Sequence, residues 1–270
     1  MKAYAKVNLL LKVINKKEDG YHNLQMINTK LDLYDNIHIK RNDTKIDTIK
    51  ALNIGGYITS SGNLILKVLK EFKNKYNIYV GYDIEIEKNI PFSSGLGGVS
   101  MDVAEVLKYV IKDNNIIISN DELINFTKQY GADIPYGFID GAAIVEGIGD
   151  IITKINLKEE EYILIMPNIE ISTPYIFSNH KYFSKACSHE ELISLVNTNN
   201  RSNDLEKTAR YIYKELDELI IELEQYGKVV MSGSGPSLLL KPFNDIDNTL
   251  NILIDKYKDI KIIKVKTKEG

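Results

Sequence analysis

The stretch Ile90-Pro91-Phe92-Ser93-Ser94-Gly95-Leu96-Gly97-Gly98-Val99-Ser100 carries the strongest structural signal in this 270-residue chain. Alternating residues 82–87 before it predict a strand, and apolar residues at helical spacing over 103–111 predict a helix after it. Glycines let backbone N–H groups approach a ligand, and a helix N-terminus presents unpaired N–H donors with partial positive charge. The stretch therefore predicts a phosphate-binding loop. The plainer alternative is a tight turn that needs glycine only for its backbone.

Two well-known phosphate-binding patterns do not fit this loop. No Gly-Lys-Ser or Gly-Lys-Thr follows it, so it is not a Walker A loop. Position 100, where the third glycine of the dinucleotide fingerprint should stand, is Ser. The loop therefore predicts phosphate binding of some other kind.

The composition is that of an ordinary globular protein, with 44% hydrophobic and 26% charged residues. Its 34 basic and 37 acidic residues give a net charge of −3, which argues against a nucleic-acid binder but leaves room for a local basic pocket. We find no apolar signal core and no run of 18 apolar residues, so we expect no membrane partner and a cytoplasmic location. The single cysteine, Cys187, excludes an intrachain disulfide, and the four histidines never fall at metal-ligand spacing.

The remaining pattern predicts an α+β fold rather than a doubly wound sheet, because strands and helices do not strictly alternate. Charged residues cluster near 153–161, which places a boundary between domains 1–155 and 156–270. Further strands are expected at 5–13, 36–40, 161–167, 229–231, 237–240 and 260–265. Further helices are expected at 65–76, 119–130, from 188, over 205–223 as one long helix, and at 250–257.

The first strand and one aspartate are the next candidates for chemistry. Residues 5–13 alternate, which predicts a half-buried strand with Lys6 and Asn8 on one face, about 7 Å apart. Asp133 follows a helix that Gly131 is placed to end in the left-handed conformation, and Pro135 favours extended backbone at Ile134. Alone, Asp133 is most simply a solvated turn residue. A pairing with Lys6 would keep it ionised and could stabilise a developing alkoxide, but the sequence does not show that they meet.

Two more segments have open interpretations. Tyr21-His22 follows a turn at Gly20 and offers a stacking face beside a directional hydrogen-bonding group, although a surface pair is the commoner case. The stretch 233–237, Gly-Ser-Gly-Pro-Ser, is equally a plain hairpin or a second loop facing a ligand. Cys187, His180 and His189 are expected to carry no chemistry.

Eight segments in order resemble the GHMP kinases, the family of galactokinase, homoserine kinase and mevalonate kinase. Each is weak alone, and the ordered set spans nearly the whole chain. The segments are 5–9 (AKVNL), 19–24 (DGYHNL), 62–65 (GNLI, with Gly62 and Asn63), 91–100 (PFSSGLGGVS), 131–135 (GADIP), 172–177 (STPYIF), 202–206 (SNDLE) and 232–236 (SGSGP).

The resemblance implies two α+β domains with the active site in the cleft between them, and ATP and Mg²⁺ as cofactors. Asp133 would take the proton of the substrate hydroxyl, and Lys6 would orient Asp133 and stabilise the developing charge, as phosphoryl transfer requires. Ser100 would contact the metal. Tyr21 and Phe177 would sandwich a cytosine ring, His22 would hydrogen-bond its edge, and Asn8 and Thr173 would contact the sugar or diphosphate. The residues implied in ATP binding are Asn63, Pro91, Phe92, Ser93, Ser94, Gly95, Leu96, Gly97, Gly98, Val99, Ser100 and Met101.

More narrowly, segment 19–24 resembles the branch of the family whose acceptor is a CDP-linked methylerythritol, in the non-mevalonate route to isoprenoid precursors. This implies a small-molecule partner, no nucleic acid or membrane partner, and a monomer or weak homodimer. A homoserine- or mevalonate-like acceptor is the second hypothesis. A nucleotide-binding relative that has lost catalysis is the third.

The loop departs from the usual family pattern at four positions. Ser93 stands at the first expected glycine, Val99 at the last, and Met101-Asp102 replace Ser-Asn. Val99 adds a Cβ where the backbone approaches the phosphate. Asp102 could repel a phosphate or help hold Mg²⁺ through water.

Overall fold

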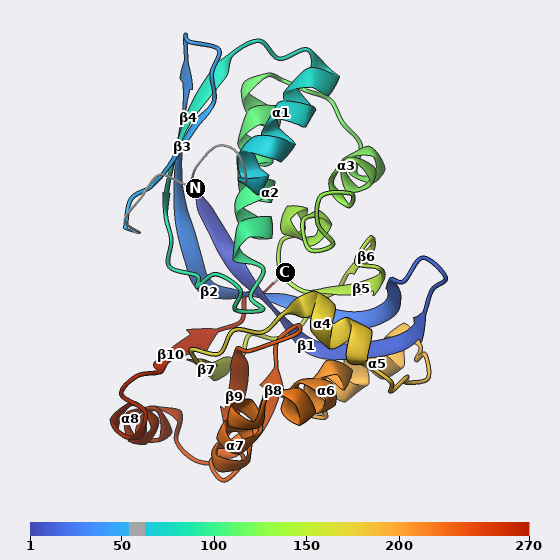
Figure 1. The fold of residues 1–270 in the computed structure, drawn as a ribbon, viewed down its shortest axis with the longest axis vertical. Helices are drawn as coiled ribbons and strands as arrows, with labels where there is room; N and C mark the ends of the chain where they lie inside the picture. The colour runs from blue at the N-terminus through green and yellow to red at the C-terminus, as the bar shows by residue number, and fades with distance from the viewer. Residues whose placement is uncertain (54–62, 270) are drawn as a thin grey trace. The chain divides into compact units, whose positions relative to one another are not determined.

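The computed structural model describes residues 1–53 and 63–269, and the chain forms two compact units of mixed helices and strands (Figure 1). Unit 1 comprises Met1–Ala5, Leu33–Phe92 and Gly97–Asp140. Unit 2 comprises Lys6–Asp32, Ser93–Leu96 and Gly141–Gly270. The predicted α+β class is confirmed. The predicted domain division at residue 155 stays a prediction.

In its described part, unit 1 contains the first residues of β1, pairs three further strands and adds four helical segments. The strands are the second half of β2 (His22–Asn42), β3 (Thr48–Ala51) and β4 (Gly81–Glu87). Strand β4 pairs antiparallel with β2, Asn36 opposite Glu87, and parallel with β3. The helical segments are α1 (Leu64–Tyr76), α2 (Gly98–Asp113), α3 (Asn120–Thr127) and the 3-10 helix η1 (Pro135–Phe138). Helix α1 lies alongside α2 (Figure 1).

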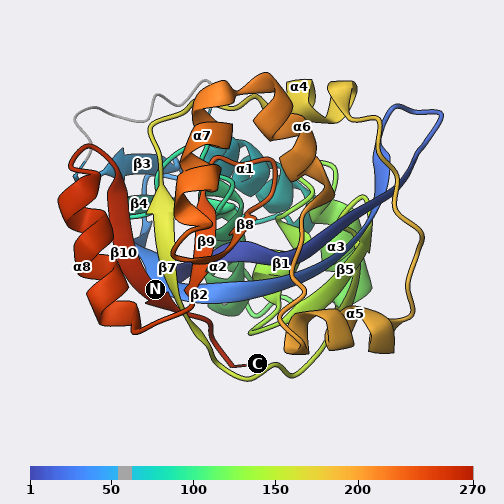
Figure 2. The same cartoon turned by 90° about the horizontal axis from the view of Figure 1, so that it is seen from below.

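Unit 2 contains strands from two sheets. Strand β1 (Lys2–Lys16) pairs with β2, and its residues from Lys6 onward belong to this unit. The first half of β2 also pairs antiparallel with β5 (Ala143–Gly147), which pairs with β6 (Ile151–Lys154). A four-stranded antiparallel sheet has the order β10-β7-β9-β8, with β7 (Glu161–Met166), β8 (Gly227–Met231), β9 (Leu238–Pro242) and β10 (Lys261–Lys266). The helices are α4 (Thr173–Asn179), α5 (His189–Asn197), α6 (Asp204–Ile212), α7 (Lys214–Leu223) and α8 (Ile246–Lys256). Helices α7 and α8 pack against this sheet (Figure 2).

Strand β1 is buried on both faces, so the prediction of a half-buried strand is wrong. Its odd residues Val7, Leu9 and Leu11 are buried as expected, but Lys6 and Asn8 are only 4% and 1% exposed. The alternation in the sequence therefore separates an apolar face from a polar face that is also covered. Polar side chains kept from water need hydrogen-bond partners, which makes this face a candidate for chemistry.

One predicted helix is two. The expected single helix over 205–223 is broken at Tyr213, which has extended backbone (φ −108°, ψ 93°) and separates α6 from α7. The two halves pack against different partners, α6 against α4 and α7 against β8. A continuous apolar stripe in the sequence does not predict this division. The stripe shows which residues are buried, but not which element each of them packs against.

Two expectations around Asp133 are also wrong. Helix α3 already ends at Thr127, and Gly131 has no left-handed backbone. Ile134 is helical (φ −63°, ψ −44°) and begins η1 despite the following Pro135. Gly131 is instead tightly packed, since a Cβ there would lie 3.3 Å from the Ile134 side chain.

A buried charge cluster ties β2, the end of β4 and α2 together within unit 1. The Lys88 ammonium bonds both the Asp35 and Asp102 carboxylates, the latter at 2.6 Å, and all three side chains are at most 3% exposed. The other Asp35 oxygen accepts the backbone N–H groups of Asn89 and Ile90 at 2.6 and 2.9 Å. The cluster thereby fixes the segment that leads into the glycine loop.

The cluster holds one more carboxylate than ammonium, which has a consequence for stability. Burial raises the pKa of Asp102 to about 7. The positive charge of Lys88 acts to lower this pKa, and the negative charge of Asp35 acts to raise it. The folded protein then holds a proton on Asp102 that the unfolded chain has lost, so Asp102 makes folding less favourable as pH rises from about 4 to about 7. Asp102 also has a buried oxygen, Oδ1, without a hydrogen-bond partner in the described part of the chain.

We therefore predict that Asp102→Asn stabilises the protein relative to wild type increasingly as pH rises from 4 to 7. Each pKa unit corresponds to about 1.4 kcal/mol, so the gain is on the order of a few kcal/mol in the free energy of unfolding. Urea unfolding at pH 5, 6 and 7 measures it, with Asp43→Asn as the matched substitution at an exposed aspartate. An Asp102→Asn curve parallel to wild type would contradict the prediction.

Candidate active site

The glycine loop joins β4 to α2, as the sequence predicts. Helix α2 begins at Gly98, and Gly97 before it has the left-handed backbone (φ 67°) that favours glycine. Within the described residues, no side chain caps this helix start. The first-turn N–H groups, including those of Val99 and Ser100, are therefore suited to an anionic ligand. Gly98 is closely packed as well, with Ile90 3.0 Å from where its Cβ would stand.

Within unit 2, the Gly-Ser-Gly-Pro-Ser turn after β8 lies directly against the glycine loop. The Ser232 hydroxyl donates to the Gly95 carbonyl oxygen at 3.0 Å, and the Ser237 N–H donates to the Ser94 carbonyl oxygen at 3.2 Å. Gly233 is close enough that its Cβ would lie 3.3 Å from the Gly95 carbonyl oxygen. The turn is therefore part of the site's construction rather than an isolated hairpin, which the sequence left open.

The same hydroxyl reaches the first strand, which brings Lys6 and Asn8 beside the loop. The Ser232 oxygen accepts the Asn8 N–H at 3.4 Å, and the Lys6 N–H donates to the Leu96 carbonyl oxygen at 2.9 Å. Along β1, the Lys6 ammonium donates to the Asn8 amide oxygen at 3.1 Å. The Asn8 amide nitrogen in turn donates to Asn28 at 2.6 Å. Sequence reasoning missed Asn28, which is fully buried on β2 and carries no local signal of its role.

In unit 1, Asp133 lies in the short loop between α3 and η1 and is half-buried. This loop is close to the start of α2, since a Cβ at Gly131 would lie 3.8 Å from the Ser100 hydroxyl oxygen. Behind it, Tyr136 is fully buried, and burial together with the charges of Asp133 and Asp140 raises the pKa of its hydroxyl. Asp133 and Lys6 belong to different units, and their pairing stays a prediction.

The predicted base-binding residues all lie in unit 2, where His22 contacts Phe177. The His22 ring lies 5.2 Å from that of Phe177 at an interplanar angle of 38°. Its Nε2 atom is buried and has no hydrogen-bond partner among the described residues. Tyr21 is 60% exposed beside it, and the Thr173 hydroxyl is 2.6 Å from that of Ser234 in the Gly-Ser-Gly turn. The structure thus connects Thr173 to the turn that contacts the loop. In the described part of the chain, the His22 Nε2 atom beside the Phe177 ring has no hydrogen-bond partner.

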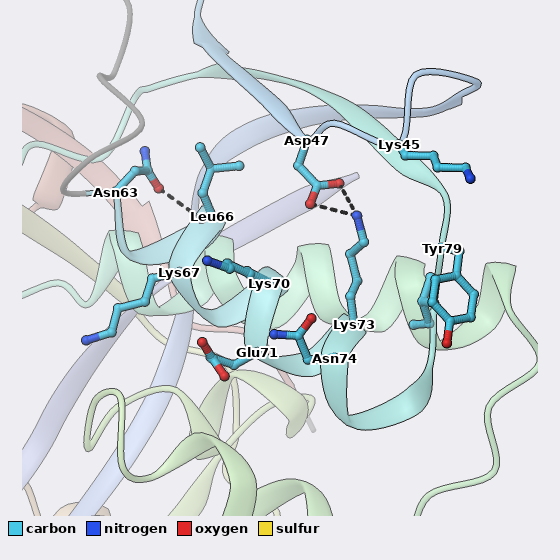
Figure 3. Close-up of a pocket in the computed structure, with 11 residues that line it drawn as sticks. Lys45, Asp47, Asn63, Leu66, Lys67, Lys70, Glu71, Lys73, Asn74 and Tyr79 are labelled. Carbon is cyan, nitrogen blue, oxygen red and sulfur yellow. Dashed lines mark hydrogen bonds and ion pairs between the residues drawn. The ribbon is translucent and has the colours of Figure 1, made fainter.

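Asn63 begins α1 and faces a cavity of about 830 Å³ in unit 1 (Figure 3). Its amide oxygen accepts the Ile65 N–H at 2.8 Å, which confirms the predicted N-cap. Farther along the wall, Lys73 pairs with Asp47 at 2.8 Å. An asparagine amide also carries a nitrogen that can donate to a ligand while its oxygen caps a helix. Gly62, quoted with the same motif, lies outside the described residues.

Each of these groups offers a chemistry that phosphoryl transfer uses. An uncapped helix start with a glycine loop binds phosphate, a carboxylate can accept a proton, and an ammonium can stabilise developing negative charge. For a divalent ion, the Ser100 hydroxyl is a suitable oxygen ligand. Asp102 is not placed for either role considered from the sequence, because its buried side chain is bonded to Lys88. In the described ranges, no cluster of three or more His, Cys, Asp or Glu residues could hold a metal alone.

Comparison with known proteins agrees with this chemistry. Residues 63–148 match the model of the GHMP kinases N terminal domain, and residues 183–258 match that of the GHMP kinases C terminal domain. The chain is 35% identical to a 4-diphosphocytidyl-2-C-methyl-D-erythritol kinase of Clostridium beijerinckii, over 98% of this chain and 99% of the relative. It is 36% identical to the protein of the same name from Clostridium tetani, with the same coverage.

Solved structures show the same fold. A crystal structure of 4-(cytidine 5'-diphospho)-2C-methyl-D-erythritol kinase matches with a TM-score of 0.83 at 22% identity, over 100% of this chain and 99% of that one. The Methanococcus jannaschii mevalonate kinase matches with a TM-score of 0.66 at 15% identity, over 99% and 98%. None of the helices in the described ranges has the length and apolar character needed to cross a membrane. By its family models and its full-length relatives, the chain belongs to the GHMP kinases.

Proposed function

We propose that this protein transfers the γ-phosphoryl group of ATP to the 2-hydroxyl of 4-diphosphocytidyl-2-C-methyl-D-erythritol, a step in non-mevalonate isoprenoid precursor biosynthesis. The observation that carries the proposal is the 35–37% identity, over nearly all of the chain, to curated kinases named for this substrate. The buried His22 nitrogen beside Phe177 supports it, because a planar base with a polar edge suits such a site.

In this proposal, the loop from Pro91 to Met101 cradles the ATP phosphates, and Asn63 lies near the adenine. The uncapped start of α2 supports this role. Ser100 would hold Mg²⁺, which supplies neutralisation of the phosphate charge when bound. The hydroxyl oxygen of Ser100 in the first turn of α2 fits such an ion.

The catalytic roles follow from the chemistry of the two charged groups. Asp133 accepts the proton of the acceptor hydroxyl, or holds it in line with the γ-phosphate. Lys6, acting with Asp133, stabilises the negative charge that develops during transfer. The support for Lys6 is its fixed position, since its backbone bonds the glycine loop and its ammonium bonds Asn8.

The acceptor's base is placed by three aromatic residues. Tyr21 and Phe177 stack on cytosine, and His22 hydrogen-bonds its edge, while Asn8 and Thr173 contact the sugar or diphosphate. Asn8 is already engaged by Lys6 and Asn28, so its first effect is to orient Lys6. Domains at 1–155 and 156–270 with the active site between them, a cytoplasmic location and a monomer or weak homodimer stay predictions.

We predict that Asp133→Asn lowers kcat by roughly 10² to 10⁴-fold, the usual contribution of a positioned acid or base, with little change in KM for ATP. The measurement is a coupled ADP-release assay with Mg–ATP and the cytidyl acceptor, run beside homoserine and mevalonate. Turnover of Asp133→Asn at the wild-type rate would refute the assigned role. Turnover by the wild type only with homoserine or mevalonate would refute the proposed substrate.

Asp140→Asn is the matched control for this variant. Asp140 lies seven positions farther along, is exposed, and like Asp133 acts electrostatically on the buried Tyr136. Removing its charge perturbs the same neighbourhood, and we expect kcat within about twofold of wild type because surface substitutions rarely matter. Equal losses in both variants would mean that the effect comes from Tyr136 rather than from proton transfer.

A second prediction concerns the loop itself. Gly95 has a left-handed backbone (φ 76°), and a Cβ there would lie 2.9 Å from the Gly235 carbonyl oxygen and closer still to that of Ser232. Gly95→Ala must therefore move the loop away from the turn, and we expect KM for ATP to rise at least roughly tenfold. Steady-state kinetics at varied ATP measure this.

Gly20→Ala is the control that distinguishes the effect of backbone strain from the effect of moving the glycine loop. Gly20 has a similar backbone (φ 87°), but a Cβ there meets nothing within 4 Å. Both variants bear strain of about 1 kcal/mol, whereas only Gly95→Ala should weaken ATP binding. An unchanged KM for ATP in Gly95→Ala would show that contact with the turn does not position the loop.

A further inference from the structure

A second aromatic ring besides that of Phe177 lies beside His22, and neither the sequence motifs nor the proposed roles include it. The Phe183 ring stacks on the His22 ring at 6.4 Å with an interplanar angle of 19°, closer to parallel than the Phe177 ring. His22 is 6% exposed, whereas Phe183 is 51% exposed. A half-exposed phenylalanine is costly to hold in place unless something orders it, so its surroundings indicate whether the stacking is built into the fold.

The segment that carries Phe183 is anchored on both sides of the ring. Before it, the His180 Nδ1 atom lies 2.9 Å from the Thr208 hydroxyl on α6, and the His180 side chain is buried. After it, the Ser184 N–H donates to the Val13 carbonyl oxygen on β1 at 2.8 Å. Phe183 therefore stands between two fixed points, on a segment without helix or strand structure of its own.

His180 also touches Phe183 directly. The two rings are 5.9 Å apart and nearly perpendicular, at 89°, which is a favoured edge-to-face arrangement. The contacts thus form a continuous series from Thr208 through His180 and Phe183 to His22. The sequence assigned no chemistry to His180, and nothing local marks it, because its partners lie on α6 and in the following loop.

We propose that Phe183, held in place by His180, is a positioning residue that fixes the plane of the His22 imidazole for recognition of the acceptor's base. The inference rests on the proposed function, in which His22 hydrogen-bonds a cytosine edge. A hydrogen bond to a base edge depends on the direction of the ring nitrogen. The His22 Nε2 atom is buried and has no hydrogen-bond partner among residues 1–53 and 63–269, and its direction is what the stacked ring would set.

The protonation state of the cluster agrees with this role. Burial lowers the pKa of His22, and the positive charge of Lys16 lowers it further. Burial also lowers the pKa of His180, against the opposing effects of the Tyr182 backbone and the Asp204 charge. Both rings are therefore neutral at pH 7, and a neutral imidazole offers one donor and one acceptor in fixed directions.

The test is Phe183→Leu, which keeps an apolar side chain but removes the ring. We expect KM for the cytidyl acceptor to rise roughly 3- to 10-fold, in line with the loss of an aromatic pair, with kcat and KM for ATP within about twofold of wild type. Phe183→Tyr keeps the ring and should restore the wild-type KM, and His180→Gln should raise it in the same direction as Phe183→Leu. An unchanged acceptor KM in Phe183→Leu overturns the proposal, as does an equal change in both KM values.

Phe243→Leu is the matched control, because Phe243 is also a half-exposed phenylalanine of unit 2, 64% exposed, at the end of β9. It should leave all three kinetic constants unchanged. A double-mutant cycle with His22→Ala then separates positioning from direct contact of Phe183 with the base. Loss of the Phe183→Leu effect in the His22→Ala background supports positioning, and persistence of the full effect overturns it.

An NMR measurement on the ligand-free protein tests this inference independently of the proposed function. The ring C–H resonances of His22, assigned with His22→Gln, should shift in Phe183→Leu and stay in place in Phe243→Leu. Unshifted resonances in Phe183→Leu overturn the proposal whatever the substrate is. If the wild type does not turn over the cytidyl acceptor, the proposed function fails, and unshifted His22 resonances in Phe183→Leu would separately overturn the role of Phe183.

Discussion

The approach of the glycine loop to the turn after β8 is the constraint on which the arrangement of unit 2 depends. A single hydroxyl, that of Ser232, bonds the Gly95 carbonyl oxygen and the Asn8 N–H, and so joins three segments that are far apart in the chain. Only glycine at position 95 permits this closeness. The backbone of Lys6 then meets the loop one residue later, at Leu96. The placement of the Lys6 backbone thus follows from backbone packing, and the bond to Asn8 then directs the Lys6 ammonium.

The sequence predicts local structure well wherever the signal is local. Asn63 begins α1 as a cap, Ser188 begins α5 with a full capping box, and the glycine loop joins β4 to α2. It fails where a distant partner decides. Tyr213 breaks a helix because the two halves pack on different elements, and Ile134 is helical although the residue after it is proline. The polar face of β1 is buried because other segments cover it, which no alternation can reveal.

The residues of the candidate site also fall into two groups, those that the sequence predicts and those that it misses. The motifs named Lys6, Asp133, His22 and Phe177 because these residue types stand in recognisable order. The residues that orient them lack such a signature. Asn28 is one asparagine in a long strand, and Phe183 is one aromatic residue in an irregular segment, and both matter only through contacts with residues far away in sequence. A reacting group must be of one residue type, so a sequence pattern can identify it. A residue that supports a reacting group can be of several types, so a sequence pattern misses it.

The buried cluster of Lys88 with Asp35 and Asp102 restricts the order in which its members can be replaced over evolutionary time. An apolar residue at position 88, introduced first, would leave two carboxylates facing each other without a cation. An amide introduced first at position 102 leaves one carboxylate and one ammonium, a balanced pair. Lineages that exchange this cluster for an uncharged core should therefore pass through the amide, and the two positions should depend on each other in any set of homologues. The buried Lys88 ammonium thus favours replacement of Asp102 before replacement of Lys88.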